Sequence, residues 1–103
     1  MRVVVLFNLK PDTEIAAYED WARTRDIPGV RSLPSIDDFQ VYRTTGLLGS
    51  SATAPYQYVE IIDIADMDGF FKDVSGAPSQ AIAREFRDFL GSEPIFILTE
   101  PLA

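Results

Sequence analysis

The chain has 103 residues, a net charge of −7 from nine basic and sixteen acidic side chains, and neither a histidine nor a cysteine. This length and a hydrophobic fraction of 47% predict one globular domain, residues 1–103. Without His or Cys, the chain cannot build a Ser-His-Asp or Cys-His nucleophile system, a His- or Cys-ligated zinc site, or an iron–sulfur cluster. We therefore expect no metal and no cofactor, and the acidic charge argues against nucleic acid and anionic membranes as partners.

The first part of the chain predicts a strand followed by a helix. Residues 2–10 are rich in β-branched and aromatic side chains, which is typical of a strand. Helical spacing follows over residues 12–25, with Asp12 or Thr13 as the cap and Pro28-Gly29 as the break. The predicted buried arc of this helix consists of Ile15, Tyr18, Trp21, Ala22 and Arg25.

Two further strands follow the predicted break. Residues 39–44 and 56–64 have strand character, and residues 45–54 between them are rich in Gly, Ser, Thr and Ala. The simplest pairing is an antiparallel hairpin with a long, mobile connection.

Two helices and a last strand complete the pattern. Asp66 is a candidate N-cap for a helix that continues to residue 74. A second helix opens at Pro78 and stops at Gly91, and residues 94–99 predict the fourth strand. The order strand, helix, strand, strand, helix, strand is the ferredoxin-like split βαβ arrangement, an α+β fold with a four-stranded antiparallel sheet and both helices on one face.

One face of such a sheet has no helix to cover it. We assign the odd-numbered positions of the first three strands to the covered face and the even-numbered positions to the uncovered one. The even-numbered set is also largely apolar. Because large exposed apolar patches usually mark interfaces, we expect a homodimer in which a second copy covers this face.

Glu60 is the candidate catalytic residue. It lies in the middle of the third predicted strand, on the face assigned as uncovered. Removal of water would raise the pKa of its carboxyl group, which could then donate or accept a proton or orient a ligand N–H. The alternative is an interface residue paired with Arg2 or Arg43.

Four further side chains are candidate substrate-binding residues. Asn8, Tyr42 and Tyr58 share the parity of Glu60 and would converge with it if the strand registers align. Trp21 would line a cavity between the first helix and the sheet, together with Tyr18 and Arg25. The alternatives are solvent or dimer hydrogen bonds for the polar groups and ordinary core packing for the aromatic ones.

Several segments together carry a family resemblance, namely VVVLFNLKP, EDW, IPGVRSLPSI, FQVYRT, YQYVEIIDIADMDGF, REFRDFL and EPIFILTE. They resemble the RedY-like HapK family of the dimeric α/β-barrel superfamily over nearly the whole chain. The resemblance implies a homodimer whose two sheets close into a barrel. It also implies an association with gene sets for prodiginine-type pyrrole pigments, on the branch leading to the methoxy-bipyrrole unit. Many sites of the wider superfamily rely on His, which this chain lacks.

Two classes of function follow from these observations. The first is a secondary-metabolism protein that binds or processes a flat aromatic or pyrrolic compound in a pocket lined by Trp21, Tyr42, Tyr58 and Glu60, with loop 45–54 as a cover. The second is a non-catalytic accessory dimer that docks onto a biosynthetic enzyme. A cavity with a perturbed carboxylate favours the first, and a filled core favours the second. We expect a cytoplasmic protein, because the apolar run 3–7 is too short to cross a bilayer and no cleavage site follows it.

Overall fold

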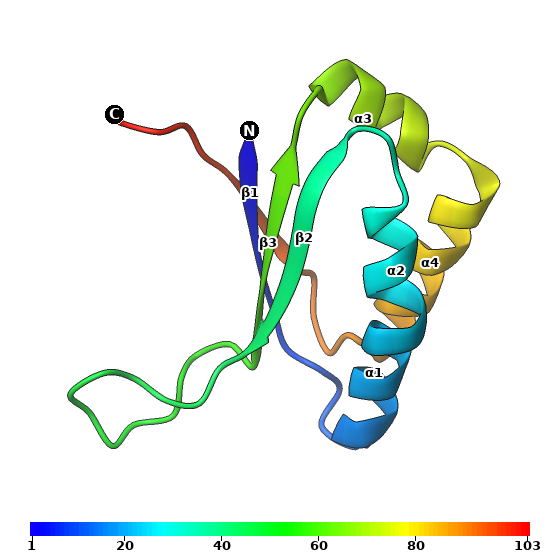
Figure 1. The fold of residues 1–103 in the computed structure, drawn as a ribbon. Helices are drawn as coiled ribbons and strands as arrows, with labels where there is room; N and C mark the ends of the chain where they lie inside the picture. Colours follow the sequence, from blue (N-terminus) through cyan, green and yellow to red (C-terminus); the bar gives the residue numbers. More distant parts are fainter.

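The computed structural model of the protein describes residues 1–103 and packs a layer of helices against one face of a sheet (Figure 1). The four strands are β1 (Arg2–Phe7), β2 (Ile36–Arg43), β3 (Tyr58–Ile64) and β4 (Ile95–Leu98). All neighbours are antiparallel, in the order β2-β3-β1-β4. The ferredoxin-like prediction is therefore confirmed.

A continuous helical segment runs from residue 15 to residue 31. Its parts are α1 (Ile15–Trp21), the π-helical turn η1 (Ala22–Asp26) and α2 (Ile27–Arg31). The prediction that Pro28-Gly29 breaks the helix is wrong. At the wide turn, the amide of Ile27 donates to the carbonyl of Ala22, five residues back. Pro28 then falls at the start of α2, where its missing N–H and fixed φ are tolerated.

The remaining helices follow the predictions more closely. They are α3 (Met67–Val74) and α4 (Ala77–Phe89). The amide of Gly69 donates to Asp66 Oδ2 at 3.0 Å, so the predicted N-cap is confirmed. None of the helices combines the length and the apolar character needed to cross a membrane.

Some predicted boundaries are wrong. No side chain caps α1, so neither Asp12 nor Thr13 acts as predicted. β2 begins at Ile36, three residues early, because a register shift between Ile36 and Asp38 lets both Ile36 and Phe39 face the core.

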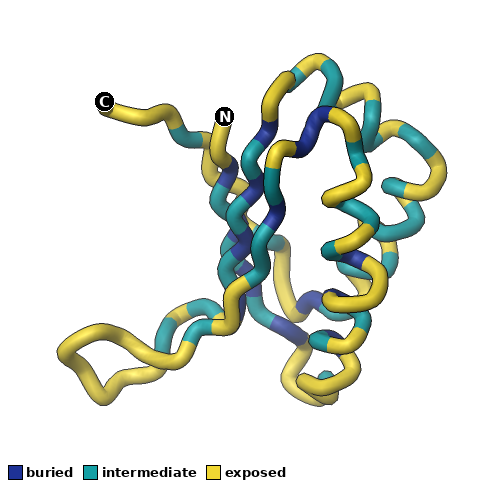
Figure 2. Tube along the Cα trace, viewed as in Figure 1, coloured by how far each residue is buried: buried dark blue, intermediate teal, exposed yellow.

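The strand register decides which side chains face the helices. Val5 of β1 and Val41 of β2 both lie opposite Glu60 of β3. Each of these pairings joins an odd-numbered residue to an even-numbered one, so the even positions of β3 share a face with the odd positions of β1. That face is buried under the helices (Figure 2). The assignment of Tyr58 and Glu60 to the uncovered face is therefore wrong.

An aromatic cluster forms the core beside these strands. The Phe7 ring is almost fully buried and stacks on Tyr58, with centroids 5.4 Å apart. Tyr18 and Phe86 approach the same ring edge-on at 5.8 and 4.9 Å. Stacked and edge-to-face aromatic pairs are favourable beyond the area they bury, so this cluster fixes α1 and α4 against β1.

The opposite face of the sheet carries two cross-sheet rows without a helix above them. One row is Tyr42, Val59, Leu6 and Ile95, and the next is Gln40, Ile61, Val4 and Ile97. All eight side chains are at least partly exposed. The loop between β2 and β3 projects away from the helices (Figure 1).

The turn after α4 is held close to the end of β1. The amide of Gly91 donates to the Asn8 carbonyl at 3.1 Å, and that of Lys10 donates to the Phe89 carbonyl at 3.0 Å. A Cβ on Gly91 would lie 2.9 Å from the carbonyl oxygen of Leu9, which is a backbone atom. Only glycine fits this approach without a backbone shift.

We therefore expect Gly91→Ala to lower the free energy of unfolding by about 1–3 kcal/mol, because the added methyl must push two backbone segments apart. Chemical denaturation measures the change. Ser92→Ala, at the exposed neighbouring position, is the control and should stay within about 0.5 kcal/mol of the parent. Equal stability of the Gly91 variant and its parent would contradict the close approach.

Candidate functional site

A cavity of about 190 Å³ lies between the helices and the sheet. Its walls come from η1, α2, α3, α4 and strands β2, β3 and β4, and they are mostly apolar. The larger wall residues are Phe39, Ile62, Phe70, Ile82, Phe86 and Phe96. Two carboxyl groups, those of Asp26 and Glu60, also line the cavity, and no Lys or Arg does. The arrangement is that of an apolar pocket with a few polar groups, which is typical of ligand sites.

Glu60 reaches the cavity from the middle of the sheet. It lies between Val41 and Val5 in a cross-sheet row that continues to Phe96. Only 5% of Glu60 is exposed, and it lies on the face opposite to the one that the sequence analysis assigned. Burial is the main cause that raises the pKa of its carboxyl group well above the usual range, and the charge of Asp26 adds to the effect.

The alternative ion pair of Glu60 with an arginine does not form within the chain. Arg2 Nε lies 2.8 Å from Asp63 Oδ1, and Arg43 pairs with Glu19 at 2.6 Å. Both guanidinium groups are thus engaged elsewhere. Glu60 keeps an unpaired carboxyl group in an apolar environment.

Asp26 reaches the same cavity from the helical layer, and the sequence analysis missed it. It ends the π-helical turn, is 5% exposed, and burial raises the pKa of its carboxyl group to about 7. The sequence signal for Asp26 was its spacing, because Tyr18, Ala22 and Asp26 follow one another at intervals of four residues. All three are buried in the structure. The predicted arc instead included Arg25, which is exposed and pairs with Glu85.

The two carboxyl groups can act together. Asp26 raises the pKa of Glu60, so the two groups are close enough to repel each other when both are ionised. The buried Tyr18 hydroxyl nearby has no hydrogen-bond partner, and burial followed by the charge of Glu60 raises its pKa. Near neutral pH, such an acid pair can hold a proton and give it to a ligand or take one from it.

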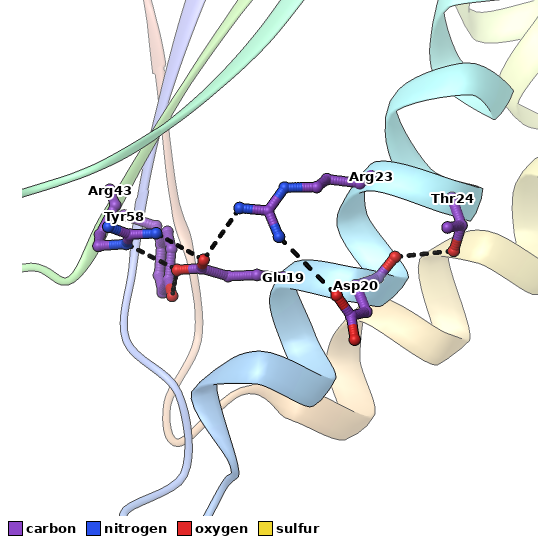
Figure 3. A network of polar contacts seen from close by, with 6 residues as sticks. All are labelled: Glu19, Asp20, Arg23, Thr24, Arg43 and Tyr58. Atoms are coloured by element: carbon purple, nitrogen blue, oxygen red, sulfur yellow. Dashed lines mark hydrogen bonds and ion pairs between the residues drawn. The ribbon is translucent and has the colours of Figure 1, made fainter.

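A separate polar network joins Tyr58 and Arg43 of the sheet to Glu19 of α1 (Figure 3). The Arg43 guanidinium donates to both carboxylate oxygens of Glu19, at 2.6 and 2.7 Å, and the Tyr58 hydroxyl donates to Oε2 at 2.8 Å. The hydrogen bonds from Arg43 lower the pKa of Glu19 to about 2. Tyr58 is thus held at both its ring and its hydroxyl.

The other predicted site residues lie apart from the cavity. The Asn8 side chain bonds to the backbone of Pro55 and Gln57 and holds the base of the β2–β3 loop. Tyr42 is 53% exposed on the uncovered face. Trp21 donates its indole N–H to Glu85 Oε1 at 2.9 Å, outside the cavity. Of the five predicted residues, Glu60 alone lines the cavity, and no residue of loop 45–54 covers it.

Comparison with known proteins places the chain in a family. The family model described as REDY-like protein HapK matches residues 1–102. The chain belongs to the HapK family. No curated protein sequence matches it.

Solved structures with the same fold include the crystal structure of HapK from Hahella chejuensis, with 25% identity and a TM-score of 0.74 over 100% of this chain and 96% of that one. SnoaB, a cofactor-independent oxygenase from Streptomyces nogalater, is similar at 17% identity and a TM-score of 0.69, covering 98% of this chain and 94% of SnoaB. A dimeric ferredoxin-like protein from Thermobifida fusca is similar at 16% identity and a TM-score of 0.67, covering 93% and 85%. The last two likenesses show the fold alone.

The buried carboxyl groups predict an unusual dependence of stability on pH. Because the folded pKa of Asp26 is raised, its contribution is fully present below the unfolded pKa and is lost as pH rises through about 7. Asp26 alone should lower the free energy of unfolding by about 3–4 kcal/mol from about pH 4 to about pH 7. Chemical denaturation at several pH values measures this decline.

Asp26→Asn should remove the contribution of Asp26, and Glu60→Gln should remove the further decline that the raised pKa of Glu60 causes. Asp88→Asn, at an exposed position of α4, is the matched control and should retain it. The pairing of Glu19 affects the parent and these variants alike, because its pKa of about 2 keeps it ionised in the folded state and only its unfolded form takes up a proton at about pH 4. Parallel pH profiles for the parent and the Asp26 variant would show that Asp26 is accessible to water.

Proposed function

We propose that this HapK-family protein is a homodimer of secondary metabolism that binds a flat aromatic or pyrrolic ring in the cavity between helices and sheet. Glu60 is the group that exchanges a proton with the ligand. The observation that carries this proposal is an unpaired, buried carboxyl group in the wall of an otherwise apolar cavity. A filled core would favour an accessory dimer without a ligand.

The volume of the cavity is large enough for a single ring at its inner end. A cavity of about 150 Å³ can hold benzene, so the 190 Å³ here suit one five- or six-membered ring. Ala83 and Phe96 are the exposed residues among those that line it, so the opening lies between α4 and β4. The second ring of a bipyrrole would lie at this opening against Phe96. The assignment to prodiginine-type pigment biosynthesis rests on the family.

Trp21 can report on binding through its neighbour. Its indole stacks on Phe86 with centroids 6.3 Å apart, and Phe86 lines the cavity. We expect pyrrole and bipyrrole aldehydes to change the Trp21 emission in a saturable way. Ala83→Phe at the opening should weaken binding by about tenfold or more, because the added ring occupies the ligand's path.

Ala16→Phe, at an exposed position of α1, is the matched control and should leave the affinity unchanged. Fluorescence titration with absorbance correction measures both affinities. The absence of any saturable response, or equal binding by Ala83→Phe and the parent, would contradict a ligand in this cavity.

The proposed homodimer is supported by the apolar surface that a single chain leaves open. Ile95 and Ile97 of β4 are exposed at the ends of the two rows on the uncovered face. Leu48 is fully exposed in the β2–β3 loop, which projects on the side away from the helices. Contiguous apolar surface of this kind usually marks an interface, and a second copy on the uncovered face would bury it. The T. fusca protein with the same fold is described as dimeric.

Light scattering on a sizing column at micromolar concentration should give twice the chain mass of 11.5 kDa. Ile97→Asp on the uncovered face should shift the protein toward monomer, because it would bury a charge in the interface. Phe71→Asp, at an exposed apolar position of α3, is the matched control and should remain dimeric. A monomeric parent protein would rule out the proposed interface.

A further inference from the structure

The ligand selectivity of the cavity follows from its two carboxyl groups. Resting on the proposed ring-binding function, we propose that Asp26 and Glu60 form a two-carboxyl acceptor that selects rings with a cationic or N–H donor group and rejects rings with a carboxylate. Protonated amines and nitrogen heterocycles with a ring N–H are the chemical classes that fit.

The two acids come from opposite walls. Glu60 stands in the sheet, in the row between Val41 and Val5, and Asp26 stands in the π-helical turn of the layer above. Both are 5% exposed and both line the cavity. A ring between sheet and helices therefore has an acceptor on each side. The π-helical turn matters here, because such turns re-aim side chains and are frequent at functional sites.

Nothing else in the surroundings satisfies these carboxyl groups. Ser79 is the remaining polar residue with a side-chain donor in the walls, and no hydrogen bond contributes to the pKa of either acid. The nearby arginines are engaged elsewhere: Arg25 with Glu85, Arg43 with Glu19, and Arg31 with the Phe39 carbonyl at 2.9 Å. The Tyr18 hydroxyl is the one other titratable group whose pKa responds to both carboxyl groups.

The protonation state of Asp26 and Glu60 determines the pH range in which a donor group of the ligand binds. Burial raises the pKa of both acids, so the empty cavity retains protons near neutral pH. A bound ammonium group replaces a carboxyl proton, which leaves to the buffer, and the resulting carboxylate accepts the hydrogen bond of the ammonium group. A neutral ring N–H donates to a carboxyl oxygen without release of a proton. Binding of the ammonium class should therefore strengthen as pH rises through about 7. A carboxylate on the ligand would add a third acidic group to the cavity and be repelled.

Three probes of similar size test the inference on the parent protein: benzylamine, benzyl alcohol and benzoate. Calorimetric titrations at about pH 5 and about pH 8 measure the affinities, and the amine stays protonated at both. At the higher pH, the affinity for benzylamine should exceed that for benzyl alcohol by about tenfold or more, because hydrogen bonds between charged groups are stronger than those between neutral groups. The advantage should shrink at the lower pH, and benzoate should bind weakest at both.

Variants of the two acids test the carboxyl acceptor separately from ring binding in the apolar pocket. Asp26→Asn and Glu60→Gln should each reduce the preference for benzylamine over benzyl alcohol at the higher pH, because each removes one carboxylate from the cavity and leaves the apolar walls unchanged. Asp88→Asn is the matched control and should keep the preference. If benzyl alcohol binds and benzylamine binds no better at either pH, the two-carboxyl acceptor is wrong while ring binding stands. If none of the three probes binds, both proposals are wrong.

Discussion

The register of the sheet is the constraint on which the rest of this structure depends. Pairing of Val5 and Val41 with Glu60 places a carboxyl group in the middle of the helix-covered face, among apolar neighbours. A charge there is costly unless it is paired, and the chain provides no cation for it. The group is therefore held as a neutral acid or by a ligand, and the cavity beside it leaves room for one.

Two carboxyl groups at adjacent rows of the same sheet face have pKa values that are shifted in opposite directions. Glu19 contacts the row of Tyr58 and Arg43 and is fully ionised, because a bidentate guanidinium and a hydroxyl satisfy it. One row along, Glu60 has no donor, and its pKa moves in the other direction. Carboxyl groups whose pKa values are pushed apart by their surroundings are a recurrent feature of sites that transfer protons.

The sheet serves two purposes because both of its faces are apolar. One face supports the cavity and the aromatic cluster around Phe7, and the other presents rows such as Tyr42, Val59, Leu6 and Ile95. This double pattern also explains where the sequence analysis failed. In the segment Tyr58–Ile64, both phases of the alternation are apolar enough to be core, so hydrophobicity could not tell which one meets the helices.

The sequence by itself determined the elements and their order. Strand and helix periodicity and the Asp66 cap depend on neighbours within a few residues, and such local preferences can be read from composition and spacing. The resulting order of elements along the chain is typical of the ferredoxin-like fold. Only the tertiary structure decided which residues share the site. The face that Glu60 occupies is set by pairing with strands more than fifteen residues away, where a slip of one residue reverses the result. Asp26 shares the cavity with Glu60 because a π-helical turn lets the helix continue through Pro28. The local sequence propensities of this segment do not predict such a turn.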